Sequence, residues 1–156
     1  MSVNEPPIRK ELVLQVDPAR AFEVLTAGIA KWWPTVTHSV GGETVEVSMD
    51  GRIGGEIVET TRDGVRHVWG TISVWDPPNR LVSSWHPGHL AVNATELEIR
   101  IEPHGSGSRL VLEHRGWERE AWAGQRESYE TGWDPVLARY EAVVAEIASP
   151  MSPGPA

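Results

Sequence analysis

The chain has no cysteine among its 156 residues. This absence excludes a disulfide framework, a thiolate nucleophile, and zinc or iron–sulfur sites with cysteine ligands. Basic residues are few as well, 14 against 22 acidic ones, and they form no cluster, so the formal charge of −8 argues against a surface for nucleic acid or anionic membranes. No apolar run reaches the length of a membrane span, and no basic segment with an apolar core opens the chain. We expect a cytoplasmic protein without membrane insertion, nucleic-acid partner, metal or cofactor.

Phenylalanine and tyrosine are scarce: one Phe and two Tyr accompany eight Trp. With 40% hydrophobic residues, a chain of this length can bury one core. We therefore predict a single domain over residues 1–148 and a flexible tail, rich in Pro, Gly and Ser, over residues 149–156.

Alternating apolar and polar residues, separated by short turn signals, dominate the chain from residue 43 onward. Charged residues alternate with Leu97, Ile99 and Ile101, so one face of the sheet should be exposed to solvent and the other covered. Short connections between consecutive strands imply an antiparallel meander. The predicted strands cover residues 8–16, 44–48, 53–60, 65–75, 81–85, 95–101 and 109–114.

Helix signals flank this strand-rich region. Asp17-Pro18 opens a helix that continues to Leu25, and a second short helix is predicted over residues 29–33. The same Asp-Pro signal at Asp134-Pro135 predicts the start of an amphipathic C-terminal helix. The elements predict an α+β fold, in which a curved antiparallel sheet of about seven strands is covered on its concave face by this helix. A helix laid across a curved sheet leaves a cavity unless large side chains fill it.

This order of elements resembles the helix-grip fold of the START-like, or SRPBCC, superfamily. The local sequence resembles its AHSA-type branch, named after activators of the heat-shock protein 90 ATPase. The motifs that carry the resemblance are VDPARAF at 16–22, GRIGG at 51–55, the stretch from Gly70 through VWDPPNRL at 74–81 to Trp85, LVLEHRGW at 110–117 and YETGW at 129–133. The resemblance implies a hydrophobic cavity that holds lipids, polyketide-like compounds or other apolar ligands, while a minority of members are cyclases, hydrolases or co-chaperones.

Large side chains near strand and helix ends, or on the covered faces, are candidates for contact with a ligand. Any single tryptophan could instead fill the core of this Phe-poor protein, but some of them should touch the cavity. The candidates of this kind are Trp33, Trp69, Trp85, Leu97, Ile99, Leu112, Trp117, Trp133, Leu137 and Tyr140.

Three polar residues could orient a ligand. His114 shares a predicted face with apolar residues of its strand, and it could bond a ligand, act as a base or serve a structural role near the strand end. Arg52 and Glu56 flank a glycine pair that favours a bend, and they could be either cavity residues or an exposed hairpin pair. Two histidines in the loop at residues 86–89 have no third ligand placed nearby, so no metal site is predicted.

The leading hypothesis is a small cytoplasmic protein that binds a hydrophobic or aromatic, lipid- or polyketide-like ligand between the sheet and the C-terminal helix. The first alternative is an aromatase/cyclase-like or hydrolytic enzyme that uses His114 or Glu56. The second is a chaperone-associated, ATPase-activator-like protein. An edge strand could also pair two chains into a homodimer.

Overall fold

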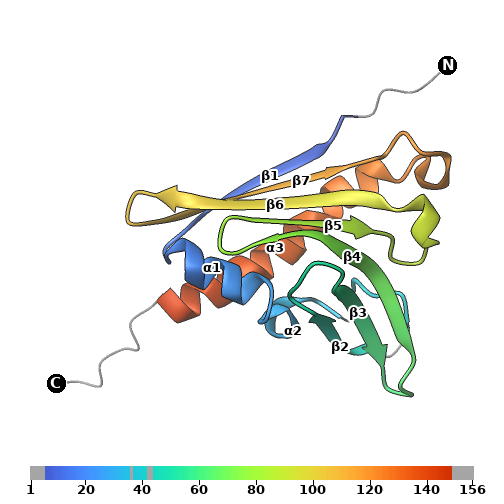
Figure 1. The fold of residues 1–156 in the computed structure, drawn as a ribbon, viewed down its shortest axis with the longest axis horizontal. Coiled ribbons are helices and arrows are strands. Elements are labelled where there is room, and N and C mark those ends of the chain that lie inside the picture. Colours follow the sequence, from blue (N-terminus) through green and yellow to red (C-terminus); the bar gives the residue numbers. More distant parts are fainter. Residues whose placement is uncertain (1–5, 36, 42–43, 149–156) are drawn as a thin grey trace.

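A computed structural model describes residues 6–35, 37–41 and 44–148 (Figure 1). In these residues a seven-stranded sheet combines with three α-helices and two short 3-10 helices. The elements are β1 (Ile8–Leu14), α1 (Pro18–Leu25), α2 (Ile29–Trp32), β2 (Thr44–Met49), β3 (Glu56–Thr61), β4 (Arg66–Asp76), β5 (Arg80–Trp85), η1 (Ala91–Asn93), β6 (Thr95–His104), β7 (Gly107–Arg115), η2 (Glu120–Trp122) and α3 (Arg126–Ala148). The predicted helix-grip fold is confirmed.

All neighbouring strands are antiparallel, in the order β1-β7-β6-β5-β4-β3-β2. The register shifts between Ile57 and Val58 in the β3–β4 pair and between Ile72 and Val74 in the β4–β5 pair. Such bulges bend a strand and increase its twist. Figure 1 shows the result: β4 curves from the wide half of the sheet toward β3 and β2, and α3 lies across the curved sheet.

The two faces of the sheet differ as the alternation predicts. On the inner face, Leu97, Ile99 and Ile101 are buried in the hydrophobic core. On the outer face, charged residues of neighbouring strands pair with one another. Arg80 and Arg115 both contact the carboxylate of Glu98, at 2.7 Å each. The apolar face is thereby turned toward α1 and α3, where any internal site must lie.

The prediction for the start of the C-terminal helix is wrong. Helix α3 begins at Arg126, and Pro135 lies inside it. The Asp17 side chain does cap α1, accepting from the amide of Arg20 at 2.8 Å, whereas Asp134 instead pairs with Lys10 Nζ at 2.9 Å. Tertiary packing therefore overrides the local signal, and more than two helical turns are added before Asp134.

Strand boundaries also shift by a few residues. β3 begins at Glu56 because Gly54, with φ of +83°, belongs to the preceding turn. β6 and β7 extend to a tight turn at residues 105–106. The predicted tail over residues 149–156 lies outside the described residues. No helix in the described part of the chain is both long and apolar enough to cross a membrane.

Candidate functional site

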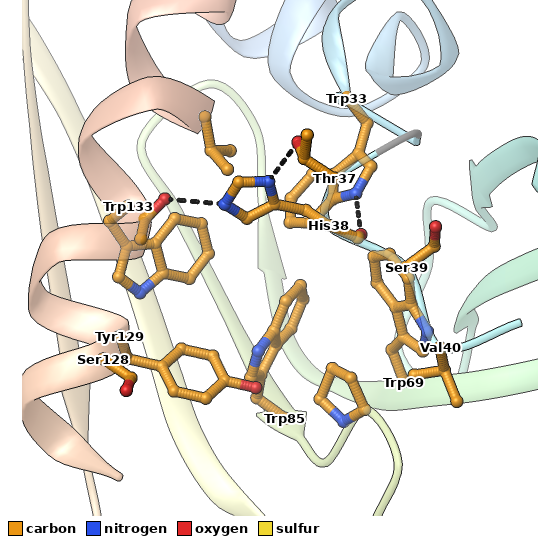
Figure 2. Close-up of a pocket in the computed structure, with 13 residues that line it drawn as sticks. Trp33, Thr37, His38, Ser39, Val40, Trp69, Trp85, Ser128, Tyr129 and Trp133 are labelled. Carbon is orange, nitrogen blue, oxygen red and sulfur yellow. Dashed lines mark hydrogen bonds between the residues drawn. The ribbon is translucent and has the colours of Figure 1, made fainter. Parts of the chain in front are cut away.

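A pocket of about 320 Å³ lies between the first half of α3, the segment that follows α2, and the inner face of β4 and β5 (Figure 2). We call it the tryptophan pocket. Its lining includes no Asp, Glu, Lys or Arg side chain. The lining residues are Trp33, Thr37, His38, Ser39, Val40, Trp69, Trp85, Pro87, Ser128, Tyr129, Gly132, Trp133 and Val136.

Four indole rings form one connected wall of the pocket. The ring of Trp33 lies at the centre of this cluster, with centroid distances of 5.0 Å to Trp69, 5.9 Å to Trp85 and 6.2 Å to Trp133. Trp85 in turn lies 5.6 Å from both Trp69 and Trp133. Centroid distances in this range are typical of edge-to-face and tilted aromatic pairs, so the rings hold one another in place.

The N–H groups of three of these indoles donate hydrogen bonds within the protein. Trp33 Nε1 donates to the carbonyl of His38 at 2.7 Å, and Trp69 Nε1 donates to Glu59 Oε1 at 3.1 Å. Trp133 Nε1 donates to His114 Nδ1, also at 3.1 Å. The indole nitrogen of the fourth, Trp85, is buried and makes no hydrogen bond of ordinary geometry.

The Tyr129 hydroxyl oxygen lies beside that nitrogen (Figure 2), where the Trp85 N–H acts on it. Burial raises the pKa of Tyr129 to about 12, and the neighbouring Trp85 N–H only partly opposes this effect. The hydroxyl is therefore protonated at neutral pH.

His38 joins the segment after α2 to α3. Its Nε2 lies 3.1 Å from the carbonyl oxygen of Gly132, and its Nδ1 lies 2.7 Å from Thr37 Oγ1. A carbonyl can only accept, so the hydrogen bond assigns a proton to Nε2, and Nδ1 pairs with the Thr37 hydroxyl. This bridge forms one edge of the pocket.

Glu59 holds the part of the pocket edge that Val40 forms. Its carboxylate, fully buried in β3, accepts from the amides of Val40 and Gly41, at 2.7 and 2.6 Å, from Thr44 Oγ1 at 2.6 Å and from Trp69 Nε1. Burial alone would raise its pKa, but the bonds from Thr44, Val40 and Gly41 outweigh burial and hold the pKa of Glu59 below its usual value. One ionised side chain thus fixes both the edge at Val40 and the orientation of Trp69.

His114 lies beneath the pocket rather than in its wall. Its Nδ1 accepts from Trp133, and its Nε2 lies 2.7 Å from Thr95 Oγ1, which itself donates to the carbonyl of Trp85. This chain of bonds assigns the neutral ring with its proton on Nε2. Burial, with a smaller contribution from Arg115, lowers the pKa of His114 to about 3. Both ring nitrogens are engaged, which is the arrangement of a structural histidine.

The structure separates the remaining predicted site residues into three groups. Leu97 and Ile99 line a smaller space of about 30 Å³ deeper in the core, which shares three tryptophans with the pocket. Leu112, Trp117, Leu137 and Tyr140 are buried in the core and line neither space. Arg52 and Glu56 lie in a separate polar hollow beside β2 and β3, where their ion-pair partners are Asp50 and Arg66.

Sequence reasoning missed several lining residues, notably His38, Val40, Tyr129 and Gly132. Those on α3 were missed because the helix was expected to begin later. Ser128, Tyr129, Gly132, Trp133 and Val136 share one helical face, and this spacing would have identified them had the helix been extended toward its N-terminus. Within the described residues, no group of three or more His, Asp or Glu side chains is placed to hold a metal ion.

A curved helix-grip sheet with an aromatic pocket beneath its long C-terminal helix defines a START-like protein. The model of the family described as activator of Hsp90 ATPase homolog 1-like protein matches residues 15–145. The chain belongs to this family.

Solved structures agree with this assignment. The Aha1 dimer from Colwellia psychrerythraea is 16% identical with a TM-score of 0.69, and the match covers 93% of this chain and 99% of that one. Protein NE0264 from Nitrosomonas europaea is 17% identical with a TM-score of 0.63, over 94% and 99% of the two chains. At these identities the likeness shows the fold. An anthrahydroquino-γ-pyrone synthase, Txn09, is 29% identical with a TM-score of 0.62, over 92% and 99% of the chains. No curated protein sequence matches the chain significantly.

Proposed function

We propose that the chain binds an uncharged aromatic small molecule in the tryptophan pocket. The observation that carries this proposal is the lining itself: four indole rings and a phenol face a pocket of about 320 Å³ that has no Asp, Glu, Lys or Arg in its wall. A charged ligand would lose its hydration there without gaining an opposite charge. A planar apolar ligand would instead gain about 25 cal/mol for each Å² removed from water, before the costs of ordering.

The size of the pocket limits the ligand. Small-molecule sites in proteins range from about 300 to 1,000 Å³, so a pocket of about 320 Å³ suits a compound of two or three fused rings. The wall is also held in place before binding. The indoles of Trp33, Trp69 and Trp133 are each fixed by a hydrogen bond, so little side-chain freedom remains to be lost when a ligand stacks on them.

Blocking the pocket tests the proposal. A side chain at Gly132 would point toward His38, whose Nε2 lies 3.8 Å from the position of an added Cβ, so Gly132→Leu should fill part of the space. Ala138→Leu is the matched control because Ala138 is exposed on the same helix. We expect equilibrium dialysis with 9-fluorenone, an uncharged tricyclic aromatic ketone, to show binding to the parent chain and the control. The Gly132→Leu variant should bind at least tenfold more weakly, and equal binding by all three chains would refute the pocket as the site.

A second candidate is a cyclase-like enzyme that acts on a ligand of this kind. It is supported by the 29% identity to Txn09, which is named as a synthase of a γ-pyrone. A minimal test is the cyclodehydration of 2-hydroxydibenzoylmethane to flavone, in which the phenol oxygen attacks the distal carbonyl and one water is lost. Mass spectrometry should detect flavone faster with the parent chain than with Gly132→Leu, and equal rates would remove this candidate.

Two partner expectations rest on relatives alone. The Colwellia Aha1 structure is a dimer, and the family name refers to an activator of the Hsp90 ATPase. Light scattering coupled to gel filtration would test a homodimer of this chain. A pull-down with this chain as bait and an Hsp90 ATPase as prey would test chaperone contact. An ATPase that is washed off the bait would count against such contact.

A further inference from the structure

We infer that the Tyr129 hydroxyl, backed by the indole N–H of Trp85, selects ligands that carry a carbonyl oxygen over hydrocarbons of the same shape. This inference rests on the proposed function, because it names the chemical class of the ligand in the same pocket. It assigns Tyr129 as a specificity-determining residue.

The first support is that Trp85 differs from the other three indoles of the pocket. Trp85 is 3% exposed, and its Nε1 has no hydrogen bond of ordinary geometry, whereas the indole N–H groups of the other three each donate to an acceptor within the protein. A buried N–H without an acceptor is costly, by about 1–3 kcal/mol. A site that leaves one donor without an acceptor is suited to a ligand that supplies one.

The second support is the position of Tyr129. Its ring packs against three aromatic rings, with centroid distances of 5.1 Å to Trp117, 5.4 Å to His114 and 5.7 Å to Trp122. This packing fixes the phenol so that its oxygen lies beside Trp85 Nε1 at the pocket wall (Figure 2). Among the described residues, the hydroxyl meets no acceptor for its own proton.

The Trp85 N–H faces the Tyr129 oxygen in a poorly aligned contact, and the proton of that hydroxyl has no acceptor among the described residues. A ligand carbonyl oxygen can accept that proton, and its second lone pair remains available to the indole N–H. A hydroxyl with its pKa raised by burial keeps its proton throughout the neutral range and so remains a donor.

The other polar side chains of the pocket do not compete for this role. Thr37 and His38 bond to each other, and the Ser39 hydroxyl donates to the carbonyl of Thr35. Ser128 is the lining residue on α3 whose side chain is exposed to solvent. Selection between an oxygenated ligand and a bare ring system thus falls to Tyr129.

A matched pair of ligands isolates the effect. Fluorene and 9-fluorenone share one tricyclic skeleton and differ at one carbon, which carries the carbonyl in the second compound. We expect equilibrium dialysis to show that the parent chain binds 9-fluorenone about fivefold to tenfold more tightly than fluorene, the range expected of one net hydrogen bond. In Tyr129→Phe the affinity for 9-fluorenone should fall to that for fluorene, while fluorene binding is unchanged.

Tyr140→Phe is the control variant. It removes the other tyrosine hydroxyl of the chain, which donates to the carbonyl of Ala21 at 2.8 Å, away from the pocket. The preference for 9-fluorenone should survive in it. An independent readout is the infrared carbonyl stretch of bound 9-fluorenone, which should shift to lower frequency in the parent chain and return toward its apolar-solvent value in Tyr129→Phe.

The outcomes separate the two proposals. If neither compound binds, the proposed function and this inference both fail. Equal binding of the two compounds to the parent chain overturns this inference alone and leaves the pocket in place. A uniform loss of both affinities in Tyr129→Phe also overturns it, since the phenol would then act through packing.

Discussion

Mild acid should destabilise this protein mainly through His114, at a pH at which its carboxylates are still largely ionised. The ring is fully buried, and its Nδ1 accepts from Trp133 Nε1 at 3.1 Å. Burial of the ring, with a smaller contribution from Arg115, makes the folded state resist protonation, and its pKa for His114 lies at about 3 against an ordinary value of 6.5. A proton added at Nδ1 would also place two N–H groups against each other.

The sign and size of the effect follow from linkage. Between these two pKa values the unfolded chain binds a proton at His114 that the folded chain does not, so stability is full above pH 6.5 and falls as the pH decreases. At pH 5.0 the unfolded state gains about 2 kcal/mol, because each pKa unit is worth about 1.4 kcal/mol. This energy hardly depends on the folded-state pKa of His114 so long as that pKa stays below about 4.

The assay is urea denaturation followed by far-ultraviolet circular dichroism at pH 7.5 and 5.0. The parent chain should lose about 2 kcal/mol of unfolding free energy through His114 between these conditions. A His114→Gln variant should lose about 2 kcal/mol less, although it starts from lower stability at pH 7.5. His104→Gln, a change at an exposed histidine on β6, should behave as the parent.

The reasoning is refuted if His114→Gln and the parent chain show the same dependence on pH. A second measurement covers the case in which that variant is too unstable to analyse. The imidazole signals of His114 in the parent, followed by nuclear magnetic resonance, should not titrate between pH 7.5 and 5.0, and they should report the tautomer with its proton on Nε2. Titration near pH 6.5 would refute the burial argument directly.

Two further predictions concern buried contacts near the pocket. Glu59→Gln should lower the free energy of unfolding by about 2 kcal/mol in urea denaturation, because the amide nitrogen that replaces one carboxylate oxygen cannot accept from donors such as Trp69. The control Glu46→Gln, at an exposed position on β2, should change the free energy of unfolding by less than about 0.5 kcal/mol. A Glu59→Gln chain as stable as the control would contradict this account. Gly70→Ala should lower the free energy of unfolding by about 3 kcal/mol, because the added Cβ would lie 1.8 Å from the carbonyl oxygen of Ser84. A loss of less than about 1 kcal/mol would show that β5 can move to accommodate the methyl group.

Strand order and the buried face could be predicted because they depend on local alternation and short turns. Leu97, Ile99 and Ile101 alternate with charged residues in the sequence, and the structure buries them accordingly. The two Asp-Pro signals show the limit of local reasoning. The same dipeptide caps α1 at Asp17 but lies inside α3 at Asp134, where the ion pair with Lys10 depends on chain packing.

The site was predictable in its apolar part and not in its polar part. Four of the five tryptophans proposed as cavity residues do line the pocket, and Trp117 packs behind Tyr129 instead. The polar groups depend on partners that are distant in sequence. His38 bonds to Gly132, 94 positions away, and Glu59 accepts from backbone amides 18 and 19 positions away. No local pattern in a single sequence encodes such pairings.

The four indoles of the pocket also have an optical consequence. Their centroids lie 5.0 to 6.2 Å from the ring of Trp33 or from one another, close enough for electronic excitation to pass between them faster than it is emitted. The cluster then behaves as one chromophore rather than four. A quencher that touches any one ring should darken the whole cluster, so the emission of the protein would report the binding proposed for this pocket.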